Sequence, residues 1–230
     1  MDHPLRIPLH ISGRAKPHGF MYFRMCAQSL IRYKFASEAL SKLHHLDPRY
    51  DDLMRETEEA SVQPVIFAGM CLEATLYDLA ACLFGEEFAQ RTEKLDPLGK
   101  FVVLAQCVDK KAPKKSHAAY QSIQALVTAR NRLVHYKSQP VPEENLSEFM
   151  VQATKAHTQH VSGIAASFRA LVLLSLYFDG NIFEELRILP SFKKPEHWES
   201  VVPCELHTEV HRCIEISLNA RKQATDETAK

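Results

Sequence analysis

The pattern of apolar and polar positions along the chain predicts helices and few other elements. Only 7 of the 230 residues are glycine, and long stretches lack both glycine and proline. A sheet protein needs frequent turns between its strands, and glycine and proline are the residues that most often make them. We therefore predict an all-α fold.

Six helical segments follow from the apolar residues, the candidate caps and the prolines. Asp96 and Pro97 form a pair suited to the start of a helix, Ser116 can cap the next helix, and Pro140 and Pro142 stop it. Pro64 is expected to kink or divide the second segment. The predicted segments cover residues 21–44, 51–84, 97–108, 117–137, 145–178 and 205–222.

These segments suggest three parts of the chain. Residues 1–17 are rich in proline and histidine and are expected to form an irregular N-terminal arm. Residues 18–180 are expected to form an antiparallel helical bundle. Residues 181–230 are less regular, contain Pro190, Pro195 and Pro203, and end in an amphipathic segment. We expect this last part to be a helical extension packed on the bundle.

The charges of the chain balance, with 28 lysines and arginines against 28 aspartates and glutamates. No global positive field therefore gathers nucleic acid, and contact with RNA needs a local basic patch. The candidate patch is a loop expected before the segment 117–137, whose four lysines can either contact RNA phosphates or face solvent. These lysines are Lys110, Lys111, Lys114 and Lys115.

The cysteines indicate a reduced protein without a metal site. They are scattered and include no C-x-x-C pair, which is typical of buried thiols in a cytoplasmic protein. One group, Cys204, His207, His211 and Cys213, does not have a standard zinc spacing, and Cys213 is expected to point away from the histidines. The six cysteines are Cys26, Cys71, Cys82, Cys107, Cys204 and Cys213.

Neither the first residues nor the apolar stretches predict a membrane segment. Basic residues interrupt the N-terminal positions, so no signal peptide is expected. The two most apolar stretches contain charges, Glu73 and Asp78 within residues 65–84 and Arg169 within residues 161–178. Neither stretch is a convincing membrane span. We therefore expect a cytoplasmic protein with no membrane contact.

The helix expected after Ser116 carries the most informative residues. At about 100° per residue, its apolar side chains form a broad arc that should face the core or a partner. Arg130 lies near the middle of this arc, and Asn131 and His135, four residues apart, lie together at its edge. A buried charge is costly unless it is paired, so Arg130 needs a carboxylate, a phosphate ligand or a cleft. The apolar residues of the arc are Ile123, Leu126, Val127, Leu133 and Val134.

Residues 129–135, with the sequence A-R-N-R-L-V-H, resemble the signature of the HEPN family. In that signature an arginine is followed a few residues later by a histidine, and asparagine often comes directly after the arginine. Residues 67–74, F-A-G-M-C-L-E-A, resemble the earlier helix of the family, which often carries an acidic residue. The resemblance covers residues 21–180 and does not extend to the residues after 180.

The resemblance implies an HEPN-like bundle that acts as a metal-independent endoribonuclease, with its active site where the motifs of two chains meet in a homodimer. His135 would take the proton of a ribose 2′-hydroxyl near neutral pH. Arg130 would bind the scissile phosphate and stabilise its charge, and Asn131 would orient the phosphate or His135. Glu73 would orient the motif or neutralise Arg130. Cleavage would leave a 2′,3′-cyclic phosphate and a 5′-hydroxyl, without a cofactor.

Many members of the family are toxins or defence effectors, so the implied partners are RNA, a second copy of the chain, and an antitoxin or other regulatory protein. Some HEPN toxins carry a tyrosine two positions after the histidine, where antitoxin partners modify them. Here Tyr136 comes one position after His135 and Lys137 comes second, so control by that route is not expected.

Two alternatives to an enzyme remain open. The first is a non-catalytic HEPN-like module whose dimer surface binds another protein or a nucleotide. The second is an unrelated helical scaffold in which the motif occurs by chance, with Arg130, Asn131 and His135 as a polar cluster that ties the bundle together.

Overall fold

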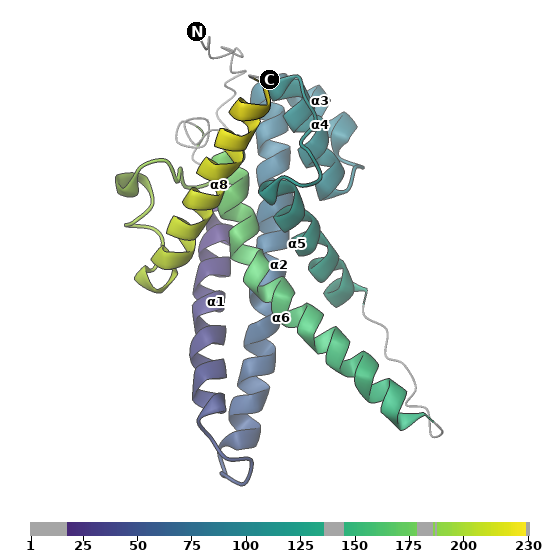
Figure 1. Ribbon diagram of the computed structural model, residues 1–230, viewed down its shortest axis with the longest axis vertical. Helices are drawn as coiled ribbons and strands as arrows, with labels where there is room; N and C mark the ends of the chain where they lie inside the picture. The colour runs from purple at the N-terminus through teal and green to yellow at the C-terminus, as the bar shows by residue number, and fades with distance from the viewer. Residues whose placement is uncertain (1–17, 136–144, 179–185, 187, 229–230) are drawn as a thin grey trace.

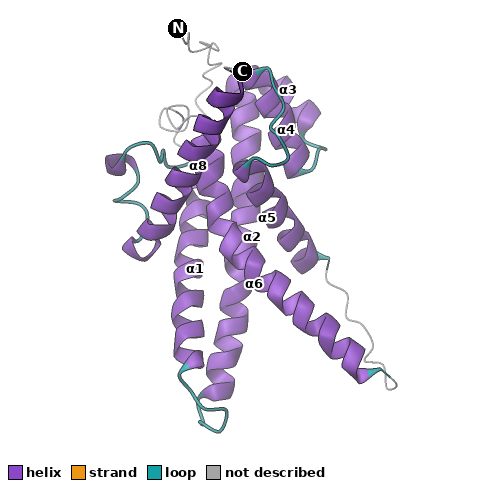
Figure 2. Cartoon of the chain, in the orientation of Figure 1, coloured by secondary structure: helices purple, strands orange, loops and turns teal. Residues whose placement is uncertain are grey.

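The computed structural model describes residues 18–135, 145–178, 186 and 188–228, apart from the side chains of residue 146 and residues 221–228. The regular elements in these ranges are α-helices and two short 3-10 helices, with no strand among them (Figure 2). The predicted all-α fold is therefore confirmed. The N-terminal arm expected over residues 1–17 lies outside the described residues.

The helices agree with most of the predicted segments to within a few residues. Two elements were missed, the short helix α3 directly after Gly85 and the 3-10 turn η1. Gly85 has a φ of 90°, a conformation that glycine adopts without strain, and it separates α2 from α3. The elements are α1 His18–Ser41, α2 Tyr50–Phe84, α3 Glu86–Thr92, α4 Pro97–Asp109, α5 Ala118–Val134, α6 Leu146–Tyr177, η1 Pro195–His197, η2 Cys204–Leu206 and α8 His207–Thr228 (Figure 1).

The caps of α4 and α5 show one correct and one wrong prediction. Asp96 caps α4, since its Oδ1 accepts hydrogen bonds from the amides of Leu98 at 2.9 Å and Gly99 at 3.0 Å. Ser116 does not cap α5. The cap is His117, whose Nδ1 accepts a hydrogen bond from the amide of Ala119 at 3.2 Å. The end of α5 comes at Val134 rather than at residue 137, and the predicted stop at Pro140 and Pro142 lies outside the described residues.

Of the two effects expected of Pro64, a kink or a division of the second helix, the division does not occur. Pro64 is buried within α2, which continues from Tyr50 to Phe84. Ala60, one turn before Pro64, and Val65, directly after it, are completely buried. Most of the stability of a helix in a protein comes from such packing, so the contacts of α2 with its neighbours maintain the helix although proline lacks one amide donor.

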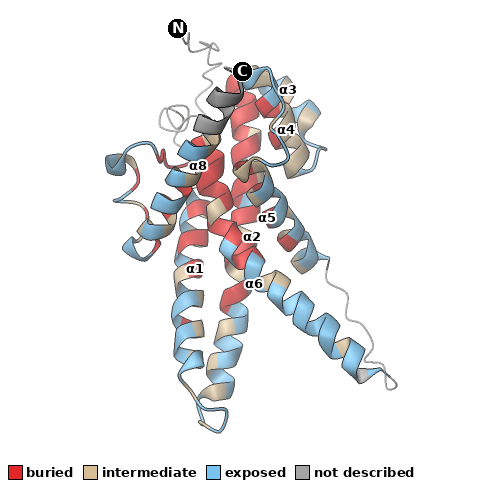
Figure 3. Cartoon of the chain, viewed as in Figure 1, coloured by how far each residue is buried: buried red, intermediate tan, exposed pale blue. Residues whose placement is uncertain are grey.

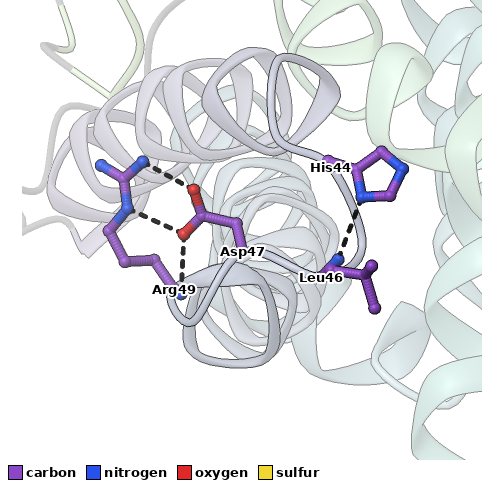
Figure 4. Close-up of polar contacts among 4 residues, drawn as sticks. All are labelled: His44, Leu46, Asp47 and Arg49. Carbon is purple, nitrogen blue, oxygen red and sulfur yellow. Dashed lines mark hydrogen bonds and ion pairs between the residues drawn. The ribbon is translucent and has the colours of Figure 1, made fainter.

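Helices α1 and α2 form a long antiparallel hairpin, visible as the two lowest helices in Figure 1. The loop between them is held by local hydrogen bonds (Figure 4): the amide of Leu46 donates to Nδ1 of His44 at 3.3 Å. Arg49 donates to the Asp47 carboxylate at 3.0 Å and 2.9 Å. These bonds lower the pKa of Asp47 to about 2.

One connected hydrophobic cluster unites the bundle with the chain after residue 187. Phe23 of α1 contacts Phe168 of α6 and Phe192, with ring centroids 5.5 Å and 6.0 Å apart. Trp198, which is completely buried, packs on Phe192 in turn. Residues 188–213 therefore pack on the same core as α1, α2 and α6.

The six cysteines are free thiols, and four of them are buried, as the sequence predicts. Burial raises the pKa of Cys26 and of Cys213 to about 12, and it also raises the pKa of Cys71. These thiols therefore remain protonated and unreactive.

The first half of α6 extends away from the other helices, toward the lower right of Figure 1, and it is largely exposed in Figure 3. Two helical stretches, Tyr50–Phe84 and Ser147–Tyr177, contain windows long and apolar enough to cross a membrane, and 67% of each window is buried inside the protein. Core helices of soluble proteins have the same properties, so these stretches are weak evidence for a membrane span.

Candidate functional site

Arg130 lies across α2 at Gly69. A Cβ atom built on Gly69 would be 2.9 Å from Cγ of Arg130, closer than side-chain carbons normally approach. The absence of a side chain at residue 69 therefore leaves the space in which the stem of the arginine runs along α2.

The guanidinium of Arg130 is held by two polar neighbours at the surface. Its Nη2 lies 3.5 Å from Oε1 of Glu73, and its Nη1 donates to Oδ1 of Asn131 at 3.2 Å. The side chain of Arg130 is 31% exposed and that of Glu73 is 43% exposed. Of the three surroundings expected for Arg130, a carboxylate, a phosphate ligand or a cleft, the structure shows the carboxylate, and this ion pair is reachable from solvent.

The buried face of α5 is turned slightly from the arc expected from the sequence. Ile123 and Leu126 are buried as predicted, and small residues, Ala119 and Ala129, complete the buried face. Val134 is 50% exposed, so of the two surroundings expected for the arc, the core or a partner, it does not lie in the core of the single chain. The contacts with α2 and α6 fix this rotation of the helix and put Arg130 at the border of the buried face.

His135 is the C-terminal cap of α5, and it is exposed. Its amide donates to the carbonyl of Asn131 at 2.9 Å. His135 comes five positions after Arg130, which corresponds to about 7.5 Å along the axis of a regular helix and about 140° around it. Within one chain, the imidazole and the guanidinium therefore leave the helix in different directions.

Helix α5 is also fixed closely against α6. A Cβ atom built on Gly163 of α6 would be only 2.5 Å from the Cβ of Ala129, and both residues are buried. Because Ala129 directly precedes Arg130, this crossing fixes the backbone position from which the arginine side chain extends. A glycine inside a predicted helix is a signal of close packing, and Gly69 and Gly163 carried that signal in the sequence.

The four lysines do not lie beside Arg130. They precede the start of α5, and the helix from His117 to Arg130 is about 20 Å long at about 1.5 Å per residue. Lys110 turns back on α4, where its Nζ donates to the carbonyl of Cys107 at 3.2 Å. Lys111 and Lys114 line a separate cavity. The structure therefore brings together Arg130, Asn131 and Glu73, and it leaves the lysines at the other end of the helix.

The two histidines of α8 pack on Trp198. The rings of His207 and His211 meet it edge to face, with centroids 5.0 Å and 5.4 Å away. Nε2 of His207 also lies 2.9 Å from the carbonyl oxygen of Val202. Among the described residues no group of three or more histidine, cysteine or acidic side chains is arranged to hold a metal ion.

Comparisons with models of protein families, with curated proteins and with solved structures found no significant match. The resemblance to the HEPN family expected above therefore depends on the sequence alone, at residues 129–135 and 67–74.

Proposed function

We propose that the protein is a metal-independent endoribonuclease of the HEPN type, in which Arg130, Asn131 and His135 cleave RNA at the interface of a homodimer. The observation that carries this proposal is the position of the three residues. Arg130 is partly exposed and held on α2, while Asn131 and His135 are exposed on the last turn of the same helix. Charged and polar groups are thus available to a phosphate and a ribose.

The contacts of Arg130 suit exchange with a phosphate. An ion pair at a protein surface contributes only about 0–1 kcal/mol, and the 3.5 Å separation from Glu73 is longer than a good hydrogen bond. A scissile phosphate can replace this carboxylate and accept two parallel hydrogen bonds from the planar guanidinium. In the free protein, Glu73 keeps Arg130 extended along α2.

His135 supplies the proton chemistry of the proposal. The unprotonated nitrogen of its imidazole would accept the proton of the ribose 2′-hydroxyl as a general base. The resulting alkoxide attacks the adjacent phosphorus atom, and the P–O5′ bond breaks. The products are a 2′,3′-cyclic phosphate and a 5′-hydroxyl once the leaving oxygen takes a proton.

A second copy of the chain completes the site. On a regular helix, positions 130 and 135 are about 140° apart, so we propose that the arginine and the histidine that act on one phosphate come from different chains. Apolar side chains are also exposed at the end of α5 and on the first half of α6, with Val134 at 50%, Met150 at 56% and Val151 at 68%. A two-fold partner would cover these side chains and bring two copies of the motif together.

The test combines oligomeric state with analysis of the product ends. We expect light scattering to give a dimer, and RNA cleaved in the presence of EDTA to carry 5′-hydroxyl ends. His135→Ala should abolish cleavage and retain the circular dichroism spectrum and the dimer. The matched control is His45→Ala, because His45 is exposed in the distant α1–α2 loop.

Three results would contradict the proposal. A monomer at micromolar concentration would remove the shared site, and full activity of His135→Ala would remove the base. Products with 5′-phosphates that form only with metal would require a different mechanism, because attack by the 2′-hydroxyl leaves no phosphate on the 5′ side.

A further inference from the structure

A cavity of about 540 Å³ lies at the opposite end of α5 from His135. Its walls come from three segments that are distant in the sequence: the loop before α5, the last turn of α6, and α8. The volume is within the range of about 300–1,000 Å³ of small-molecule sites. The side chains that matter for its chemistry are Lys111, Lys114, His117, Tyr177, Ile216 and Asn219.

Two aromatic rings make part of the wall rigid. The imidazole of His117 and the ring of Tyr177 meet edge to face, with centroids 5.1 Å apart and planes at 90°. Tyr177 also packs on Phe101, a completely buried residue, at 5.0 Å. Nδ1 of His117 accepts the amide hydrogen of Ala119, which fixes the ring at the start of the helix. A planar ligand group would therefore meet aromatic side chains that are already in place.

The polar groups of the cavity favour an anion. Lys111 and Lys114 stand against a single acidic residue, Asp109, so the charged lining residues leave a net positive charge. Asp109 also accepts a hydrogen bond from the hydroxyl of Tyr177, and burial together with this carboxylate raises the pKa of Tyr177. The tyrosine thus remains neutral and does not oppose a negative ligand.

The remaining wall residues suit the uncharged part of such a ligand. Pro113, Ala118 and Ile216 provide apolar surface, and Asn219 offers an amide that both donates and accepts hydrogen bonds. This combination of positive charge, fixed rings, apolar surface and one amide is the chemistry that recognises a phosphate joined to a sugar and a planar base.

We propose that this cavity binds a nucleoside phosphate, with the phosphate at Lys111 and Lys114 and the base against Tyr177, His117 and Ile216. The ligand is either a free nucleotide or one nucleotide of an RNA strand. The cavity is about 20 Å along α5 from Arg130, so this inference does not depend on the cleavage proposed above.

Isothermal titration calorimetry of the full chain with AMP tests the proposal. We expect saturable one-site binding, and Lys111→Ala should weaken it by at least about tenfold, the loss expected for one charge-assisted hydrogen bond. Lys115→Ala is the matched control, because Lys115 is exposed in the same loop but does not line the cavity. Ala112→Trp tests the space itself, since it places a large side chain at an exposed wall position.

Inorganic phosphate and a short single-stranded RNA are the two comparison ligands. Phosphate should bind at least about tenfold more weakly than AMP, since it lacks the base and sugar. RNA that AMP displaces identifies the strand as a source of the ligand, whereas AMP binding without such competition identifies a free nucleotide. Both results support the site.

The proposal is overturned by any one of four results: no AMP binding at millimolar concentration, equal binding of AMP and phosphate, unchanged affinity in Ala112→Trp, or equal weakening by Lys111→Ala and Lys115→Ala. His135→Ala should bind AMP as the wild type does. Loss of cleavage and loss of this site can therefore be distinguished.

Discussion

The crossing of α5 and α6 should depend on a single methyl group. A Cβ atom at Gly163 would lie 2.5 Å from the Cβ of Ala129, about 1 Å short of ordinary contact between carbon atoms. The Cβ of Ala129 cannot rotate away, so Gly163→Ala must separate the two helices. Overpacking of this kind costs about 1–3 kcal/mol, and alanine recovers about 1 kcal/mol of that through its helix propensity. We expect a net loss of about 1 kcal/mol.

The exchange of the two residues should restore the crossing. Ala129→Gly alone loses about 1 kcal/mol of helix propensity and up to about 0.8 kcal/mol of methyl burial. In the double variant Ala129→Gly/Gly163→Ala, one methyl group again separates the helices and the two propensity changes cancel. We expect its free energy of unfolding to be within about 1 kcal/mol of the wild type, which corresponds to a coupling of about 2–3 kcal/mol.

The free energies of unfolding of the wild type, the two single variants and the double variant form a double-mutant cycle. Urea denaturation followed by circular dichroism at one protein concentration measures all four. Ser162→Ala is the control, because Ser162 is the exposed neighbour of Gly163 and should change stability little. If Gly163→Ala were as stable as the wild type, or if the two substitutions were additive, the close crossing deduced from the structure would be wrong.

Three further predictions concern the site and its surroundings. Arg130→Lys should lose most RNase activity because an ammonium cannot make the two-pronged phosphate contact. Arg132→Lys, at an exposed position, should retain that activity. Equal activities of the two variants in a cleavage assay would reject phosphate binding by Arg130. Glu73→Gln should change the free energy of unfolding in urea by no more than about 1 kcal/mol, since its ion pair lies at the surface; a larger loss would indicate a structural role. Burial, and then the charge of His157, lower the pKa of His160. Just below its ordinary pKa of about 6.5, the unfolded chain therefore binds more protons than the folded one, and stability should fall as the pH drops through that value. Urea titrations between about pH 7.5 and 5.5 should show a smaller fall for His160→Gln, and an unchanged fall would assign the effect to another group.

Local features of the sequence determined the helices and the order of the candidate residues. The Asp96-Pro97 pair predicted the start of α4, and the lack of glycine over long stretches predicted an all-α chain. The placement of Arg130, Asn131 and His135 on one helix also followed from the sequence, because backbone hydrogen bonds and side-chain periodicity in a helix connect residues only a few positions apart.

Packing between distant segments decided the rest. It kept α2 continuous through Pro64, set the rotation of α5 that leaves Val134 exposed, and placed Arg130 against Gly69 and Glu73. None of these contacts has a local signature that names the partner, since each depends on how two helices approach and turn relative to each other.

The lining of the cavity at the start of α5 was likewise predicted in part by the sequence and decided in part by the tertiary structure. The sequence identified its basic loop, but Tyr177 comes from the end of α6 and Ile216 from the middle of α8, both far along the chain. The charges of a segment can be predicted from its residues alone. Whether those charges face water or a cavity depends on which side chains the folded chain places opposite them, and this is decided by the burial of the common core.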